Sequence, residues 1–402
     1  MGAIKFSCKK AALSVLAFAT ILSAAAVSRA EDYAIAQSYI HSFNNGVTVY
    51  TELFALNKDF DLNTSGYVKY NIDLINPSFG GEGGEGGGNS LTKNNSRAVA
   101  AVSGASSAAS NGGGRDTRHD LLAGVTHNFN NIVGVEAYLD YSREKDYTSK
   151  TPTLTFKKDL FDKNTTVTLG YSRNMDTISG AFMNGSRDRT TDNYFAGVTQ
   201  LLSPNTAAQI GYSRTNSRGF ESEGIRLVPI GGVAASTCTA LSATCEYENF
   251  PGKRNRNAYL AGVNHYFSNP RFGLLDRASV HFQYRYYKDS WDIRSNTAEI
   301  EYYKYFSDEW LMRLDYRYYT QSKAFFHKDA PVATDEFKSA SPQIKSFNTN
   351  LAGAKLVYNF KDNKKDPSAW IKNGSLEGKY EFYTESISGN AHIFMAGLRL
   401  LL

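Results

Sequence analysis

Apolar and polar residues alternate with a period of two along most of the chain beyond residue 30. Residues 135–141 read VEAYLDY, residues 280–286 read VHFQYRY and residues 312–318 read MRLDYRY. Because successive side chains of a β-strand point to opposite faces, each segment predicts a strand with one apolar and one polar face. The strands around these segments are about ten residues or longer, which is enough for a tilted strand to cross a bilayer.

Turn signals divide the chain into sixteen such strands. The predicted spans are 33–43, 47–60, 66–76, 118–129, 133–147, 152–160, 165–175, 190–202, 205–219, 255–267, 277–288, 291–306, 309–321, 346–360, 375–386 and 390–402. An even number of strands places both chain ends on the periplasmic side of a bacterial barrel, so that the odd-numbered connections are extracellular. The four longest connections, residues 77–117, 176–189, 220–254 and 322–345, are all odd-numbered. The sequence therefore predicts an all-β fold, a transmembrane antiparallel up-and-down β-barrel of about sixteen strands.

The first thirty residues have the pattern of a secretory signal peptide. Three lysines precede an apolar stretch from Ala11 to Val27, and Ser28 and Ala30 supply the small residues of a cleavage site. A transmembrane anchor is the alternative, but the apolar run is short for one. Cleavage of residues 1–30 would leave one domain, residues 31–402, and would lower the formal charge from +5 to +1, because this segment carries four basic residues and no acidic one. Export predicts the bacterial outer membrane as the location, and the small charge argues against nucleic acid as a partner.

Aromatic residues make up 13% of the chain, with 26 Tyr and 24 Phe, and in a barrel they form girdles at the two membrane interfaces. The tripeptide Tyr-Ser-Arg recurs at residues 141–143, 171–173 and 212–214. The alternation turns each Tyr toward lipid and each Arg to the same face, ~7 Å further out. Arg143, Arg173 and Arg214 are therefore predicted to reach lipopolysaccharide phosphates. The alternative is that they simply point to water.

Charged residues occupy lumen-facing positions in the later strands. The predicted lumen-lining residues are Arg285, Glu299, Glu301, Arg313, Asp315, Arg317, Glu377, Lys379 and Glu381. One interpretation is a pore wall of mixed sign that orients or selects polar solutes. The other is an interlocked salt-bridge network that fills part of the lumen without a conducting path.

Two connections have unusual compositions. Residues 77–117 are rich in Gly, Ala and Ser and form the predicted constriction of the lumen, although a flexible surface loop is the default for this composition. Cys238 and Cys245 lie in another long connection, where an oxidising compartment favours a disulfide between them. No His clusters beside them, so a metal site is less expected.

Features of an enzyme are weak in this sequence. The seven His residues are scattered, and none has the spacing of metal ligands. His127 and His265 fall on lipid-facing positions near the inner rim, but no paired Ser presents itself for a membrane lipase. We therefore expect no catalytic activity and no cofactor.

Several motifs resemble a bacterial outer-membrane family known only as domain of unknown function 3570. The most specific are RYYKDSWDI at 285–293 and YYTQ at 318–321, and shorter matches occur at 103–106, 145–147, 164–166, 202–205, 217–220, 247–251 and 264–266. The Gly/Glu-rich insert at 80–88 and the loop of Cys238 and Cys245 depart from the family pattern. The resemblance implies an outer-membrane barrel, and it implies no activity, since the family has no catalytic residues to transfer.

These features favour a porin-like channel or passive transporter for small polar solutes. The competing hypothesis is a non-conducting scaffold that holds periplasmic or surface proteins through its loops. The expected partners are outer-membrane lipid, lipopolysaccharide, the solutes and the outer-membrane barrel assembly machinery. Leu402 stands where such barrels usually end in Phe, which departs from the signal read by that machinery.

Overall fold

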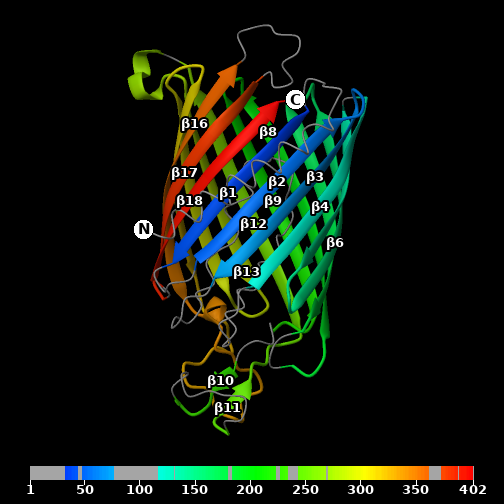
Figure 1. Cartoon of the computed structure of the whole chain (residues 1–402), viewed down its shortest axis with the longest axis vertical. Coiled ribbons are helices and arrows are strands. Elements are labelled where there is room, and N and C mark those ends of the chain that lie inside the picture. Colours follow the sequence, from blue (N-terminus) through cyan, green and yellow to red (C-terminus); the bar gives the residue numbers. More distant parts are fainter. Residues whose placement is uncertain are drawn as a thin grey trace.

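The computed structural model describes residues 32–401, apart from 44–47, 77–115, 131, 180–182, 223–226, 234–242, 269, 362–372 and 388. The described residues form one closed β-barrel and a small two-stranded sheet outside it (Figure 1). The first eight barrel strands are β1 (Tyr33–Phe43), β2 (Thr48–Asp59), β3 (Thr64–Asn76), β4 (Asp116–Phe129), β5 (Val133–Arg143), β6 (Tyr147–Leu160), β7 (Thr165–Ile178) and β8 (Arg187–Ser203). The other eight are β9 (Thr206–Gly219), β12 (Lys253–Phe267), β13 (Ala278–Asp289), β14 (Arg294–Tyr305), β15 (Trp310–Gln321), β16 (Phe347–Lys361), β17 (Asn373–Glu385) and β18 (Gly389–Leu401). The small sheet pairs β10 (Leu227–Pro229) with β11 (Cys245–Tyr247).

Every barrel strand is antiparallel to both neighbours, and the barrel closes where β1 pairs with β18. Closure leaves no strand edge, which satisfies the requirement that backbone polar groups within a bilayer be hydrogen bonded. All sixteen predicted strands are therefore confirmed. Several boundaries differ by two or three residues, and the one between the fifth and sixth strands was wrong. The segment 133–147 is not a single strand, because the backbone N–H of Glu144 donates to the carbonyl of Tyr147 at 2.7 Å and closes a turn. β5 ends before this turn and β6 begins at Tyr147.

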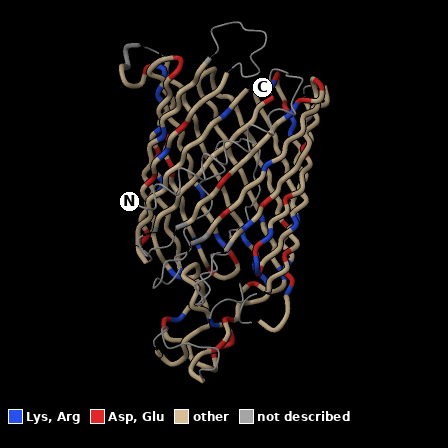
Figure 2. The backbone as a smooth tube through the Cα atoms, in the orientation of Figure 1, with Lys and Arg blue, Asp and Glu red and all other residues tan. Residues whose placement is uncertain are grey.

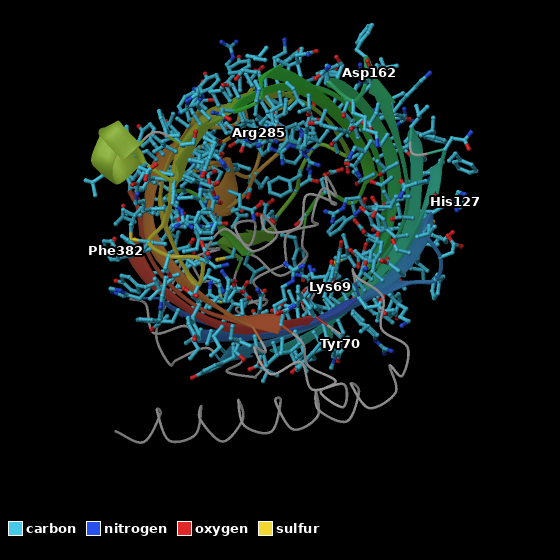
Figure 3. The ribbon with its side chains drawn as sticks, turned by 90° about the horizontal axis from the view of Figure 1, so that it is seen from above. Lys69, Tyr70, His127, Asp162, Arg285 and Phe382 are labelled. Carbon is cyan, nitrogen blue, oxygen red and sulfur yellow. The ribbon has the colours of Figure 1, made fainter. Side chains whose placement is uncertain are left out.

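The two faces of the barrel wall differ in polarity. Leu139, Ile210 and Phe282 are exposed on the outer face, whereas charged and hydroxyl side chains line the inner face. In the view along the barrel, Lys69 and Arg285 lie inside the ring of strands, and Tyr70, His127 and Phe382 lie outside it (Figure 3). An apolar outer face and a polar interior are the pattern of a transmembrane barrel.

The two rims of the barrel carry different connections. The strand β18 ends at one rim, here called the C-terminal rim, where short turns such as 60–63, 204–205 and 306–309 join neighbouring strands. The 3-10 helix η2 (Pro270–Leu275) lies in the longer connection 268–277 at the same rim. The opposite rim, here called the loop rim, carries the long connections, and the predicted constriction at 77–117 falls there almost wholly outside the described residues.

Two of the long connections pack together at the loop rim, and their described residues are here called the cap. They are residues 220–252, which contain β10 and β11, and residues 322–346, which contain the 3-10 helix η3 (Pro342–Ile344). Figure 1 shows this cap at the end of the barrel opposite the C-terminus. Asn249 and Lys338 exchange two backbone hydrogen bonds of 2.9 and 3.0 Å, which join the two connections.

A small apolar core fixes the cap to the barrel. Trp291 and Ile293, in the short connection between β13 and β14, are each 2% exposed and pack against Phe326 and Ile344 of the cap. The ring of Phe250 lies 5.2 Å from that of Trp291. The cap is thus a folded structure seated on the β13–β14 hairpin.

No helix among the described residues is long and apolar enough to cross a membrane.

Candidate functional site: the barrel lumen

All nine predicted lumen-lining residues face the inside of the barrel. They occupy β13 to β15 and β17, and charged residues are spread along these strands as well as in the cap (Figure 2). Their orientation follows from the alternation with outward-facing apolar neighbours such as Phe282, Ile300 and Leu314, which are exposed to 45%, 46% and 42%. Strand periodicity was sufficient to place them.

Arg313 is the centre of a network that joins most of these residues. Its guanidinium lies 3.0 Å from Asp315, 3.7 Å from Glu301 and 3.9 Å from Glu381. Lys379 reaches Glu381 at 2.9 Å. Since Arg313 is 7% exposed and Glu381 only 2%, the network is packed against the wall. These five residues therefore form an interlocked salt-bridge network, which is the second of the two interpretations of the charged positions.

A second pair extends the network toward β1. Lys355 forms an ion pair with Glu377, which also accepts a hydrogen bond from the side-chain amide of Gln37. Two glycines make room for these carboxylates. A Cβ at Gly353 would lie 2.7 Å from an oxygen of Asp315, and one at Gly397 would lie 2.7 Å from an oxygen of Glu377.

Arg285 and Arg317 differ from Arg313 in that they lack an ion pair among the described residues. Neither has an acidic atom within 4.0 Å among the described residues, whereas Arg313 has three such partners. The guanidinium of Arg285 lies over the ring of Tyr287 at 5.6 Å. Arg317 is opposite Glu299 in the register of β14 and β15. Both guanidiniums therefore retain hydrogen-bonding capacity toward an anionic group in the lumen.

Other inward-facing arginines on the barrel strands are mostly ion-paired. The nearest acidic partners are Asp120 for Arg118 at 3.1 Å, Asp176 for Arg189 at 2.9 Å, Asp289 for Arg254 at 2.6 Å and Glu221 for Arg256 at 3.8 Å. Arg399, near the C-terminal rim, instead stacks on Tyr33 at 4.6 Å. Among the described residues of β13 to β15, Arg285 and Arg317 are thus the inward-facing arginines without an acidic atom within 4.0 Å.

A second charged cluster, which was not predicted from the sequence, lies on β2 to β4 and in the turn between β5 and β6. Arg118 is held by Asp120 at 3.1 Å, by Asp73 at 3.8 Å and by Glu144 at 3.7 Å. The hydroxyl of Thr51 donates to Asp73 at 2.5 Å. The period-two alternation of polar and apolar residues could have identified these inward-facing charges, but it is less regular in these strands than in the later ones.

The wall formed by β6 to β9 is mostly neutral and polar, apart from the ion pair of Asp176 and Arg189. Ser149 donates to Asp176 at 2.7 Å, and Asn193 donates to Asn174 at 2.9 Å and accepts from Thr215 at 2.8 Å. Thr191 and Ser217 lie 3.0 Å apart. Hydroxyl and amide groups offer both donors and acceptors, so this side of the lumen is less charged than the side formed by β13 to β17.

The outer face carries a belt of tyrosines whose hydroxyls donate to, or bond with, a polar side chain on the next strand. The pairs are Tyr70–His119, Tyr171–Asp192, Tyr212–Asn257, Tyr284–Asn296, Tyr316–Asn350 and Tyr380–His392, with distances of 2.6–2.9 Å. We call these six pairs the tyrosine belt. Rings with a polar tip are typical of the membrane interface.

The three predicted outer arginines also point away from the lumen. Arg143 is exposed, Arg173 lies 3.9 Å from Asp192 of the tyrosine belt, and Arg214 donates to Asn216 at 3.1 Å. Each of these arginines lies two residues beyond its tyrosine toward the loop rim and on the same outer face. This is the position that the Tyr-Ser-Arg pattern predicts.

The remaining predicted features have mixed positions. Cys245 is disulfide-bonded, and its predicted partner Cys238 lies outside the described residues. His127 and His265 are on the outer face at the C-terminal rim, and each ring nitrogen lies 2.8 Å from a threonine hydroxyl, Thr64 and Thr206 respectively. In the part of the chain that is described, no three His, Cys, Asp or Glu side chains are grouped to hold a metal.

Two cap groups have shifted pKa values. Burial lowers the pKa of His327 below its usual value, and the nearby Lys345 and Lys323 act in the same direction, although Asp329 at 3.4 Å opposes them. A hydrogen bond from Lys328 lowers the pKa of Asp335. The cap therefore favours a neutral His327 and an ionised Asp335.

The closed strand order and the polarity of the two faces define a transmembrane β-barrel with a charged lumen. The family model described as "Protein of unknown function (DUF3570)" matches residues 7–186 and 180–399, and the chain belongs to this family. Among curated proteins, none is significantly similar to it.

Several solved barrels are similar in architecture. A bacterial polysaccharide outer membrane secretin has 9% identity and a TM-score of 0.48, over 93% of this chain and 100% of that one. OccD3 (OpdP) of Pseudomonas aeruginosa has 9% identity and a TM-score of 0.44, over 94% and 93%. OccK8 (OprE) of the same organism has 9% identity and a TM-score of 0.44, over 92% and 98%. The assignment of the fold rests on the strand pairing of this chain itself.

Proposed function

We propose that this protein is an outer-membrane channel or passive transporter for small polar solutes. The observation that carries the proposal is the polar inner wall of a sixteen-stranded barrel. Barrels of this size are too wide for side chains alone to fill and leave an aqueous passage. The ion pairs around Arg313 join side chains of β14, β15 and β17, which lie close together in the wall. This arrangement favours an open passage beside the network over a lumen that the network blocks.

The solute would pass between two unlike surfaces. On one side, Arg285 and Arg317 offer guanidiniums without an acidic atom within 4.0 Å among the described residues, and on the other the hydroxyls of β6 to β9 offer neutral hydrogen bonds. Such an arrangement favours polar solutes and, among them, those that carry a carboxylate or phosphate. The loop rim would face the outside of the cell, because the long connections of outer-membrane barrels are extracellular.

Planar-bilayer recording of the purified barrel tests this proposal. We expect discrete conductance steps, and we expect their size to change in the double variant Arg285→Gln/Arg317→Gln. The variant Arg143→Gln, which removes an outward-facing cation, serves as the matched control and should conduct like the wild type. A silent barrel, including one in which residues 77–111 are deleted, would contradict the channel.

A second function is favoured by the cap. Its two connections share an apolar core and buried polar contacts, such as the 2.7 Å hydrogen bond from Ser222 to Glu248. A folded structure of this kind is a suitable surface for holding another protein at the membrane. A silent barrel that still binds a surface or periplasmic protein through its loops would support this scaffold function instead.

A further inference from the structure

Outward-facing cations are gathered on one arc of the barrel, between the tyrosine belt and the loop rim. Besides the three predicted arginines, this arc carries Lys150 on β6, Arg218 on β9, Lys253 on β12, Lys288 on β13 and Arg294 on β14. Their outward orientation follows from the parity of exposed apolar neighbours on the same strands, such as Leu154, Ile210 and Phe282. We call these eight cations the basic face. The same arc also carries the outward carboxylates Asp188 and Asp192 of β8, and Asp192 lies 3.9 Å from Arg173.

The rest of the circumference lacks such charges. On β15 to β18 and β1 to β4, the described outward positions between the tyrosine belt and the loop rim hold Tyr, Phe, Ile, Leu, Ser, Thr, Asn and His, without Lys, Arg or Asp. Glu52 on β2 also faces outward, but it is an acid and accepts a hydrogen bond from Ser38. The basic face is therefore a property of β5 to β14 and not of the rim as a whole.

Within the basic face, cations stand directly opposite each other. Arg218 pairs in register with Lys253, and Lys288 pairs with Arg294. Like charges in directly opposed cross-strand positions destabilise a sheet. None of these four side chains has an acidic partner within 4.0 Å among the described residues. An anion from outside the protein would remove the repulsion.

The depth of these residues limits what that anion can be. The tyrosine belt marks the interface of the membrane, and Lys288 is four residues beyond Tyr284, ~14 Å along a strand. This position is just outside the apolar layer, where the phosphates of the outer-leaflet glycolipid lie. Arginine and lysine are the usual partners of phosphate groups.

We infer that the basic face is a binding site for the phosphates of lipopolysaccharide, with the opposed pairs Arg218/Lys253 and Lys288/Arg294 at its centre. The barrel would then have a fixed glycolipid neighbour on the side of β9 to β14 and, on the other side, strands without described outward cations near the loop rim. This binding does not depend on whether the lumen conducts.

The test uses the full barrel in detergent and fluorescent bisphosphorylated lipid A as the probe. The quadruple variant Arg218→Gln/Lys253→Gln/Lys288→Gln/Arg294→Gln removes both pairs. The control variant Lys157→Gln/Lys158→Gln/Lys163→Gln/Arg277→Gln removes the same charge at the opposite rim. Heat-modifiable gel mobility establishes that each variant has folded.

We expect the dissociation constant to rise about tenfold or more in the quadruple variant, because four of the cations that attract an anionic lipid are removed. A tenfold change corresponds to about 1.4 kcal/mol. The control should bind like the wild type, and lipid A without its phosphates should bind weakly to all three. Equal binding by the wild type and the quadruple variant would overturn the inference. Undiminished binding of dephosphorylated lipid A to the wild type would overturn it as well.

Discussion

Substitution of Gly353 by alanine is a direct test of the lumen network. The added Cβ would lie 2.7 and 2.8 Å from the two carboxylate oxygens of Asp315 and 2.9 Å from Cγ of Glu381, whereas ordinary contacts begin near 3.4 Å. The carboxylate of Asp315 must retreat by roughly 0.7 Å, which stretches its 3.0 Å contact with Arg313 beyond a good hydrogen bond. Overpacking of this kind costs 1–3 kcal/mol, so we expect a loss of about 2 kcal/mol in the free energy of unfolding.

The neighbouring strand supplies a matched control. Gly378 on β17 faces outward, and a Cβ there would meet nothing within 4 Å. Gly378→Ala should change the free energy of unfolding by less than about 0.5 kcal/mol. Urea unfolding in phospholipid vesicles, followed by far-UV circular dichroism, measures both variants. If the two unfolding curves shift equally, the carboxylates of the network are not packed around Gly353 and the reasoning fails.

Three further predictions concern the lumen and the cap. Arg285→Gln/Arg317→Gln should reduce anion permeability relative to cation permeability, seen as a shifted reversal potential in a KCl gradient; an unchanged potential would contradict the exposed guanidiniums. Trp291→Ala should cost the cap about 3–5 kcal/mol of packing and make residues 220–252 sensitive to protease while the barrel keeps its heat-modifiable mobility; a resistant cap would refute the apolar anchor. Because burial lowers the pKa of His327 below its unfolded value of about 6.5, the cap should be fully stable above that pH and lose stability as the pH falls below it. His327→Gln should abolish this dependence of proteolysis on pH, and a pH profile identical to that of the wild type would rule out His327 as its source.

The sequence by itself determined the barrel. A period of two in polarity fixes which side chains share a face, and turn residues fix where strands reverse, so the sixteen strands and the inner position of residues such as Arg313 and Glu381 follow from local rules. The Tyr-Ser-Arg repeats likewise predicted the face of Arg143, Arg173 and Arg214. The misplaced boundary near Glu144 arose because a three-residue turn without Gly or Pro gives a weak signal.

Only the tertiary structure decided which charges meet. Ion pairs such as Arg313 with Glu381 join strands that are not adjacent, and the pairing depends on the register and curvature of the closed sheet. The same is true of the cap, where connections about ninety residues apart share a core because both rise from the same arc of the rim. The opposition of Lys288 and Arg294 likewise follows only from the register of β13 and β14. The alternation of each strand shows that both side chains face outward, but it does not show that they are neighbours. Local periodicity specifies faces, and contact between side chains requires the closed barrel.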